Sequence, residues 1–299
     1  MKTLWALVLG VNALWSFEYA LSPTQVAKGV YCYFGAPEVM DTHNNGNMVN
    51  SCFVDAGFHW LVIDSGPSYM YAKDALLHVN KVMDVAYVIN THVHDDHWLG
   101  NGFYAQKGAE IIGPAHFSDV FHEHMTPRMA RRISKAAYEK TVPTPPNHMI
   151  EKSTRLQVDG LSVEIVHVDS KAHTSGDLFV YIAQLETLFA GDLVFNDRLP
   201  LLGDGDINGW IAALEQIKSY RAKHIIGGHG VRHDSESAEF TYRYLSELRR
   251  LVREAIAKGV SIEDAVASIR MDAYKKSALY ELTHRANVEA AYRMLEWEE

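Results

Sequence analysis

The sequence predicts an α/β fold of four layers, an αββα sandwich in which two sheets pack face to face between outer helices. Strand-like runs fall into two batches, and helical patterns are interleaved with both. Neither an internal repeat nor a low-complexity linker divides the 299 residues. Hydrophobic residues make up 47% of the chain and charged residues 22%, which suits one large core. We therefore predict a single domain over residues 21–299.

The two batches are separated by the proline-rich stretch 141–149, which we interpret as a surface loop. The first batch of strands covers 28–34, 49–55, 59–64, 85–91 and 109–113. The second covers 161–168, 177–183, 187–191 and 223–227. Helical spacing of apolar residues indicates helices over 70–82, 97–106, 117–137, 208–221 and 236–258, followed by C-terminal helices at 261–268 and 276–297.

Residues 1–20 have the pattern of a cleaved signal peptide. Lys2 supplies a positive charge, residues 3–15 are almost wholly apolar, and Ala13 and Ser16 offer small residues for cleavage. An uncleaved membrane anchor is the alternative, which the short apolar run with its internal Asn12 disfavours. We expect an exported, periplasmic protein with no membrane span in its mature part.

Cys32 and Cys52 are the only cysteines. Each lies in a strand-like run, and adjacent antiparallel strands would bring them together as a disulfide in an oxidising compartment. Two small buried side chains are an equally good interpretation.

The net charge of −9 argues against a nucleic-acid partner, which would need a basic surface. A small-molecule substrate is the expected partner, and nothing in the sequence fixes the oligomeric state.

The stretch "NTHVHDDHWLG", residues 90–100, concentrates metal-binding side chains after an apolar strand. His92 and His94 alternate along the chain, so both can face one side, whereas Asp96 and His97 follow where a helix starts. One metal ion could take the first pair and a second ion the other pair. Each ion needs further ligands, because zinc prefers about four.

Three later residues are candidates for those ligands. His173 lies in "KAHTSGD", Asp192 in the apolar strand "LFAGDLVF", and His229 in "HIIGGHG", between glycines that let the backbone approach closely. Each one alone is explained as a hydrogen-bonded residue at the end of a strand. Taken together, they favour a metal site.

The pattern H-x-H-x-D-H, with "VIDSG" at 62–66 before it and "GGHG" at 227–230 after it, resembles the metallo-β-lactamase superfamily. This resemblance implies two zinc ions, one bound by His92, His94 and His173 and the other by Asp96, His97 and His229. It implies that Asp192 bridges the ions and that Asp64 orients ligands from behind. It assigns catalytic roles to Asp96 and Asp64, and it leaves Asp95 solvated.

The implied activity is that of a zinc hydrolase, in which a hydroxide shared by two zinc ions attacks a carbonyl group. True β-lactamases of this superfamily generally lack an aspartate at the position of Asp192, so esters, lactones or thioesters are expected before β-lactams. The run 188–217 and the C-terminal "HRANVEAAYRMLEWE" are similar to exported zinc metallohydrolases associated with quinoprotein dehydrogenase or sulfur-oxidation systems.

Three alternatives stay open: a glyoxalase-II-like thioesterase, a persulfide dioxygenase with one iron ion, and a non-catalytic periplasmic metal-binding or assembly factor. Iron is less expected than zinc. Four residues that flank the motif loops are candidates for a substrate pocket: Lys171, Asn196, Arg198 and Asn208. Four other histidines are interpreted as surface or lid residues: His116, His122, His124 and His148.

Overall fold

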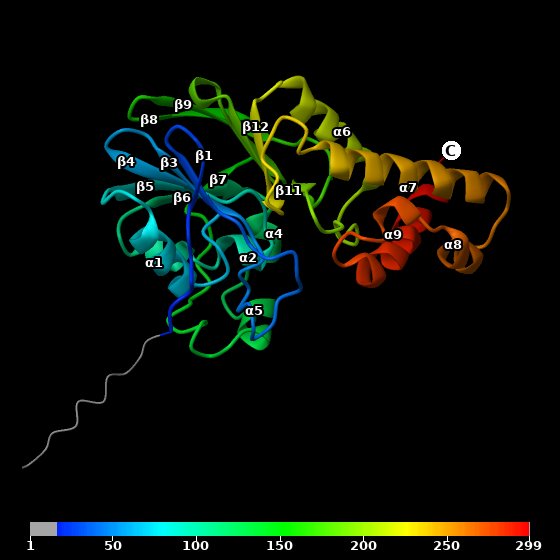
Figure 1. The fold of residues 1–299 in the computed structure, drawn as a ribbon, viewed down its shortest axis with the longest axis horizontal. Helices are drawn as coiled ribbons and strands as arrows, with labels where there is room; N and C mark the ends of the chain where they lie inside the picture. Colours follow the sequence, from blue (N-terminus) through cyan, green and yellow to red (C-terminus); the bar gives the residue numbers. More distant parts are fainter. Residues whose placement is uncertain (1–16, 299) are drawn as a thin grey trace, which may run out of the picture.

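The computed structural model describes residues 17–298 and has the predicted αββα architecture (Figure 1). The first sheet contains seven strands in sequential order, with antiparallel pairing from β1 to β4 and parallel pairing from β4 to β7. Its strands are β1 (Thr24–Ala27), β2 (Val30–Tyr33), β3 (Ser51–Asp55), β4 (His59–Ile63), β5 (Asp84–Ile89), β6 (Glu110–Pro114) and β7 (His148–Ile150).

The second sheet has five strands in the order β12-β11-β10-β9-β8. Its antiparallel strands end in one parallel pair, β11 with β12, which provides two of the polar candidates. The strands are β8 (Thr154–Val158), β9 (Leu161–His167), β10 (Leu178–Ile182), β11 (Thr187–Phe195) and β12 (His224–His229).

Three hydrophobic clusters correspond to the three interfaces between the four layers. One contains side chains from both sheets and fills the space between them. A second lies between the first sheet and helices α1 (Tyr69–His78) and α3 (Asn101–Ala105). The third packs α6 (Ile207–Ser219) and α7 (Glu239–Ala257) on the second sheet. This arrangement leaves the loops at one end of both sheets free to form a site.

Several elements differ from the sequence prediction. The expected helix 117–137 is two short helices, α4 (Phe117–Val120) and α5 (Arg128–Arg132), because Phe121 is extended and Pro127 lacks the N–H that a helix interior needs. The expected helix 97–106 is divided into α2 (Asp95–Trp98) and α3. Strands β1, β7 and β8 were not predicted, since all three are short and partly exposed.

The predicted signal segment falls largely on residues 1–16, which lie outside the described residues. The expected domain start at residue 21 is too late, because Tyr19 is already part of the core. Its side chain is 5% exposed, its N–H donates to Asp74 Oδ2 at 2.8 Å, and its hydroxyl donates to the Asn45 carbonyl at 2.7 Å. The folded domain therefore includes at least Tyr19.

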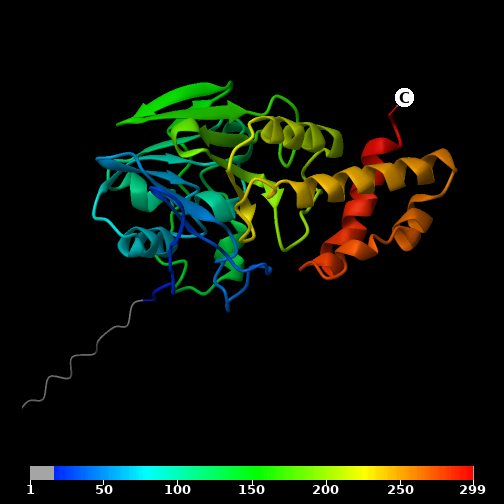
Figure 2. The same cartoon turned by 45° about the horizontal axis from the view of Figure 1, so that its top comes forward.

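The C-terminal helices extend the molecule on one side of the sandwich (Figure 2). α9 (Tyr280–Leu295) packs on α7, and α8 (Ile262–Ser268) packs on α9. A buried hydrogen bond between Tyr244 and His284 Nδ1, 3.1 Å, joins α7 to α9. Over the described part of the chain, no helix combines the length and apolarity that a membrane crossing requires.

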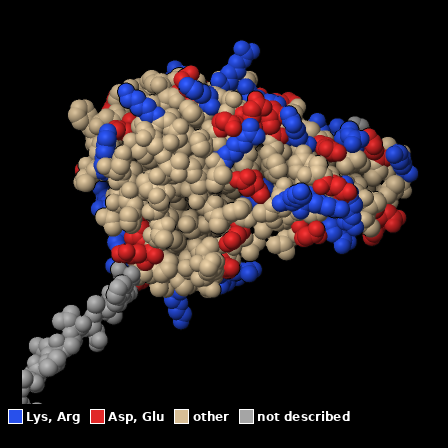
Figure 3. Space-filling view, in the orientation of Figure 1, with Lys and Arg blue, Asp and Glu red and all other residues tan. Residues whose placement is uncertain are grey.

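Acidic and basic side chains are interspersed on the face of the molecule shown in Figure 3. Many pair locally, as Arg250 does with Glu254 and Arg293 with Glu289 on exposed helix faces. Such exposed pairs contribute little to stability.

Candidate metal centre

The seven predicted ligands converge at one end of the sandwich, although they come from both sheets. His92 and His94 follow β5, and Asp96 and His97 lie in α2. The second sheet and its loops provide the other three: His173 between β9 and β10, Asp192 in β11, and His229 at the end of β12. They form two groups with the spacing of a metal site: His92, His94, His173 and Asp192, and then Asp96, His97 and His229.

The first group brings three imidazole nitrogens together. His94 Nδ1 lies 3.1 Å from His92 Nε2 and 2.9 Å from His173 Nε2. Asp192 Oδ2 is 3.3 Å from His173 Nε2 and 3.7 Å from His92 Nε2. Three imidazoles around one point, with a carboxylate beside them, match the donor set that zinc takes in catalytic sites.

The second group contacts both oxygens of the same aspartate. His97 Nε2 lies 3.1 Å from Asp192 Oδ1, and His229 Nε2 lies 3.3 Å from Asp192 Oδ2. Asp96 Oδ2 completes the group at 3.7 Å from His97 Nε2 and 3.6 Å from His229 Nε2. Asp192, a member of the first group, therefore also contacts two histidines of the second.

Unpaired buried atoms test whether these residues fit a metal ion. His97 Nε2 and Asp192 Oδ1 are fully buried, and neither has a hydrogen-bond partner among the described residues. Leaving such atoms unpaired is costly in a protein interior, and coordination of a divalent cation removes that cost. The residues therefore fit metal binding.

Two glycines make room for Asp192. Gly191 lies at an irregularity in the pairing of β11 with β12 and has a φ of +51°, and a Cβ there would meet Thr91 Oγ1 at 2.4 Å. A Cβ on Gly228 would lie 2.0 Å from Asp192 Oδ1. The glycines of "GGHG" therefore allow the close approach that the sequence predicted. β11 also continues to Phe195, so Asp192 lies inside the strand and not at its tip.

Asp64 orients two ligand histidines, His97 directly and His92 through Thr91. Its carboxylate accepts from His97 Nδ1 and from the Thr91 hydroxyl and N–H, all at 2.8 Å. The Thr91 hydroxyl also lies 3.0 Å from His92 Nδ1. Asp64 has a φ of +55°, a strained conformation for a non-glycine residue. These contacts fix the outer nitrogens of two imidazoles, so that the other nitrogens face the metal site.

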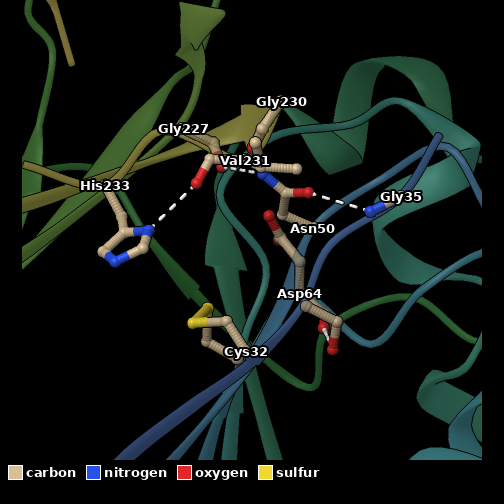
Figure 4. The surroundings of a disulfide bond; sticks show 10 residues. Cys32, Gly35, Asn50, Asp64, Gly227, Gly230, Val231 and His233 are labelled. Carbon is tan, nitrogen blue, oxygen red and sulfur yellow. Dashed lines mark hydrogen bonds between the residues drawn. A yellow bond between two sulfur atoms is a disulfide. The ribbon is translucent and has the colours of Figure 1, made fainter. Parts of the chain in front are cut away.

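His229 is held by the chain segment before β3. Its Nδ1 contacts the carbonyl oxygen of Met48. Asn50 then joins this segment to the β12 end, because its amide donates to the Gly227 carbonyl at 2.9 Å and the Gly230 carbonyl at 2.8 Å (Figure 4). The two sheets are thus tied together beside the metal centre.

The Cys32–Cys52 disulfide, one of two equally good interpretations of the sequence, is present in the structure. It connects β2 to β3 at a directly paired position, within the cluster between the sheets. Figure 4 shows it near Asp64 and the Asn50 contacts.

Asp95 is not solvated, contrary to the expectation. It is 5% exposed, and its carboxylate accepts from Arg128 Nε at 2.8 Å and from the Met129 N–H at 3.1 Å. Arg128 Nη2 also donates to Asp96 Oδ1 at 3.0 Å, which leaves Asp96 Oδ2 to face the histidines. The reason is tertiary: α5 packs on α2 and places the Arg128 cation beside Asp95, a contact that no local sequence pattern predicts.

The shifted pKa values of Asp96 and Asp192 keep both carboxylates charged. Burial alone would raise the pKa of Asp96, but His97, Arg128 and His229 outweigh burial and hold it at about 2. Burial would likewise raise the pKa of Asp192, and the surrounding histidines instead hold it well below its usual value. Burial lowers the pKa of His92 well below normal. The two ionised carboxylates and the neutral His92 are the protonation states that metal binding requires. His97 differs, because burial would lower its pKa but Asp192, Asp64 and Asp96 raise it well above normal, so a metal ion would have to displace a proton there.

The candidate pocket residues separate into three places. Lys171 lines a cavity beside His94. Asn196 and Arg198 lie next to His229 instead: the Asn196 N–H donates to the His229 carbonyl at 3.0 Å, and Arg198 Nη1 is 3.4 Å from His229 Nδ1. The side chain of Asn208 contacts Arg249 and Glu298 of the C-terminal region.

Several residues that support the ligands were not predicted. Thr91 directly precedes the histidine motif, and that position was the only available signal. Asp204, whose Oδ2 is 3.3 Å from His94 Nε2, and Met48, Asn50 and Arg128 act from distant segments. The four other histidines lie outside both ligand groups, as expected.

Comparison with known proteins agrees with this geometry. Over 227 residues the chain is 25% identical to the atrochrysone carboxyl ACP thioesterase dmxR1 of Cryptosporiopsis sp. (strain 8999), and the match covers 74% of this chain. The chain spans 62% of that relative's length.

Solved structures show the same fold. A metallo-beta-lactamase from Pontibacter korlensis superposes with a TM-score of 0.59 at 21% identity, covering 76% of this chain and 99% of the other. The DIM-1 metallo-beta-lactamase exposed to ceftazidime gives a TM-score of 0.60 at 17% identity, covering 76% and 97%. The family model described as the metallo-beta-lactamase superfamily matches residues 44–229, which include all seven converging side chains. The chain therefore belongs to the metallo-beta-lactamase superfamily.

Proposed function

We propose that the protein is an exported dinuclear zinc hydrolase that cleaves an ester, a lactone or a thioester. One observation carries the proposal: seven buried side chains converge in two groups of metal ligands that share Asp192. A fold that had kept only a structural role would not need to bury two carboxylates and five imidazoles around unpaired atoms.

Each residue has a distinct part in this proposal. His92, His94 and His173 would hold one zinc ion, and Asp96, His97 and His229 the other. Zinc bound in such a pair supplies a water of lowered pKa as nucleophile and a positive charge for the developing oxyanion. Asp64 and Thr91 keep two imidazoles in the tautomer that leaves Nε2 free to coordinate. Arg128 directs one Asp96 oxygen away from the metal site.

The thioester is favoured among the candidate substrates because the Cryptosporiopsis relative is a thioesterase. Asp192 supports the same preference, since the sequence resemblance associates an aspartate at this position with activities other than β-lactam hydrolysis.

Export is proposed from the N-terminal pattern of residues 1–20. The Cys32–Cys52 disulfide supports it, because disulfides persist in oxidising compartments.

The test combines elemental analysis with turnover on zinc-loaded mature protein. Thioesters, esters, lactones and β-lactams are compared by kcat/KM, which reports transition-state binding. We expect two zinc ions per chain and a thioester, ester or lactone ranking first. A β-lactam ranking first would contradict the substrate class. One iron ion with oxygen uptake would indicate the dioxygenase, and two zinc ions without turnover would indicate a binding protein.

A further inference from the structure

A cavity of about 450 Å³ opens beside the metal centre, at the one ligand that reaches the surface. The His94 side chain is 22% exposed, whereas the other six ligands are 5% exposed or less. Any substrate therefore has to approach on the His94 side. The cavity volume lies within the range of small-molecule sites, roughly 300–1,000 Å³.

The wall of the cavity next to His94 is apolar. It is formed by side chains of the segment after β5 and of the α4 region: Val93, Trp98, Phe117, Val120, Phe121 and Met125. Trp98 packs edge-on against Phe117 and Phe121, with ring centroids 5.5 and 6.2 Å apart. Its only polar atom, Nε1, donates to the Val93 carbonyl at 2.8 Å. This wall therefore offers carbon surface and no free hydrogen-bonding group from the indole.

The opposite rim carries two charges of opposite sign, Lys171 and Asp204. Asp204 is held by His94 Nε2, and Lys171 makes no ion pair with another described residue. Thr174, which also lines the cavity, donates its hydroxyl to Asp177 at 2.9 Å. The lining thus carries one charge of each sign, and the apolar wall forms its larger part.

We propose that this cavity binds an apolar chain or ring attached to the reacting carbonyl, so that the substrate is an ester or thioester of a hydrophobic acid. This inference rests on the proposed hydrolase function and adds the substrate class. The hydrophobic effect supplies the selectivity, because each methylene that leaves water for the Trp98 wall stabilises the bound state.

The test is a series of S-acyl-N-acetylcysteamine thioesters from acetyl to octanoyl, which vary the acyl chain and keep a small polar leaving group. With zinc-loaded full-length mature protein, kcat/KM should rise by up to about fourfold for each added methylene, equivalent to about 0.8 kcal/mol. In Val120→Asp the octanoyl-to-acetyl ratio should collapse, because a charge now faces the chain. Phe121→Ala should lower the same ratio by removing part of the wall.

Val82→Asp is the matched control, since Val82 is fully exposed and does not line this cavity. It should keep the wild-type ratio. Calorimetric binding of 1-octanol to the zinc-loaded proteins gives a readout besides turnover, and Val120→Asp should weaken it at least tenfold. A flat or falling series in the wild type, an unchanged ratio in both cavity variants, or no octanol binding would overturn the proposal. Octanol binding that depends on Val120, with no thioester hydrolysed, would contradict the hydrolase and leave the apolar site standing.

Discussion

Asp192 joins the two ligand groups, because its two oxygens face imidazole nitrogens of both. Asp192→Asn keeps the size of the side chain and removes its charge. The second metal ion should then be lost, whereas the first should persist on three imidazoles. Turnover should fall by a factor on the order of 10²–10³, since charge stabilisation in the transition state depends on both ions.

Zinc content and kcat/KM, with circular dichroism as a check of folding, test this prediction. Asp272→Asn, an exposed carboxylate of the C-terminal region, is the control and should behave as wild type. A variant that retained two zinc ions and a near-normal rate would show that Asp192 does not bridge.

Arg128 positions the second site without touching a ligand histidine. Its guanidinium donates to both Asp95 and Asp96, so Arg128→Met frees the Asp96 carboxylate to rotate. Affinity for the second zinc ion should fall by about 10–100-fold, the usual effect of removing a residue that orients a ligand. Competition with a chromophoric chelator measures it. Arg131→Met, an exposed neighbour on α5, should change nothing. Equal affinities of the two variants for the second zinc ion would show that Arg128 does not orient Asp96.

The elements show which parts of the site a sequence can predict. The dense motif at 92–97 suggested two pairs of ligands from the residues alone, and the family resemblance implied how His173, Asp192 and His229 complete them. The supporting residues depend on which loop packs where: Met48 and Asn50 reach His229 from about 180 positions away in the chain. Arg128 was assigned to a long helix that does not form, because Pro127 interrupts it. Short edge strands such as β1 and β7 bury too little to leave a pattern.

The β2–β3 disulfide closes a loop with a sequence separation of 20 residues that includes Met48 and Asn50. In the loop-entropy description it should stabilise the fold by about 3 kcal/mol. The variant with both Cys32→Ala and Cys52→Ala should lose about that free energy of unfolding, measured by denaturant titration. Wild-type protein should show no free thiol when it is denatured without reductant. Two titratable thiols, or an unchanged free energy of unfolding, would contradict the assignment.

At the scale of the whole molecule, the position of Tyr19 restricts where the chain can be cut. Its hydrogen bonds to Asp74 and Asn45 belong to the folded domain, so removal of the leader should leave a mature chain that begins at or before Phe17. Intact-mass measurement on protein from the envelope fraction gives the first residue of the mature chain. A start after Tyr19, or a full-length chain in the cytosol, would contradict it.

Two truncated proteins provide the matched comparison. A chain beginning at Phe17 should be as stable as the mature protein. A chain beginning at Ser22 loses the buried side chains of Tyr19 and Leu21, and its free energy of unfolding should fall by about 1.5–3 kcal/mol for each.

The ligands are divided between the two halves of the chain: four precede the proline-rich loop 141–149 and three follow it. Neither half alone can therefore complete a site, and the order of assembly is constrained. A polypeptide that has folded only its first sheet offers each metal ion two ligands, so we expect it to bind metal weakly and reversibly. Tight metal binding requires the three ligands that the second sheet and its loops provide. The metal content of a sample should therefore measure the fraction of molecules that have completed folding.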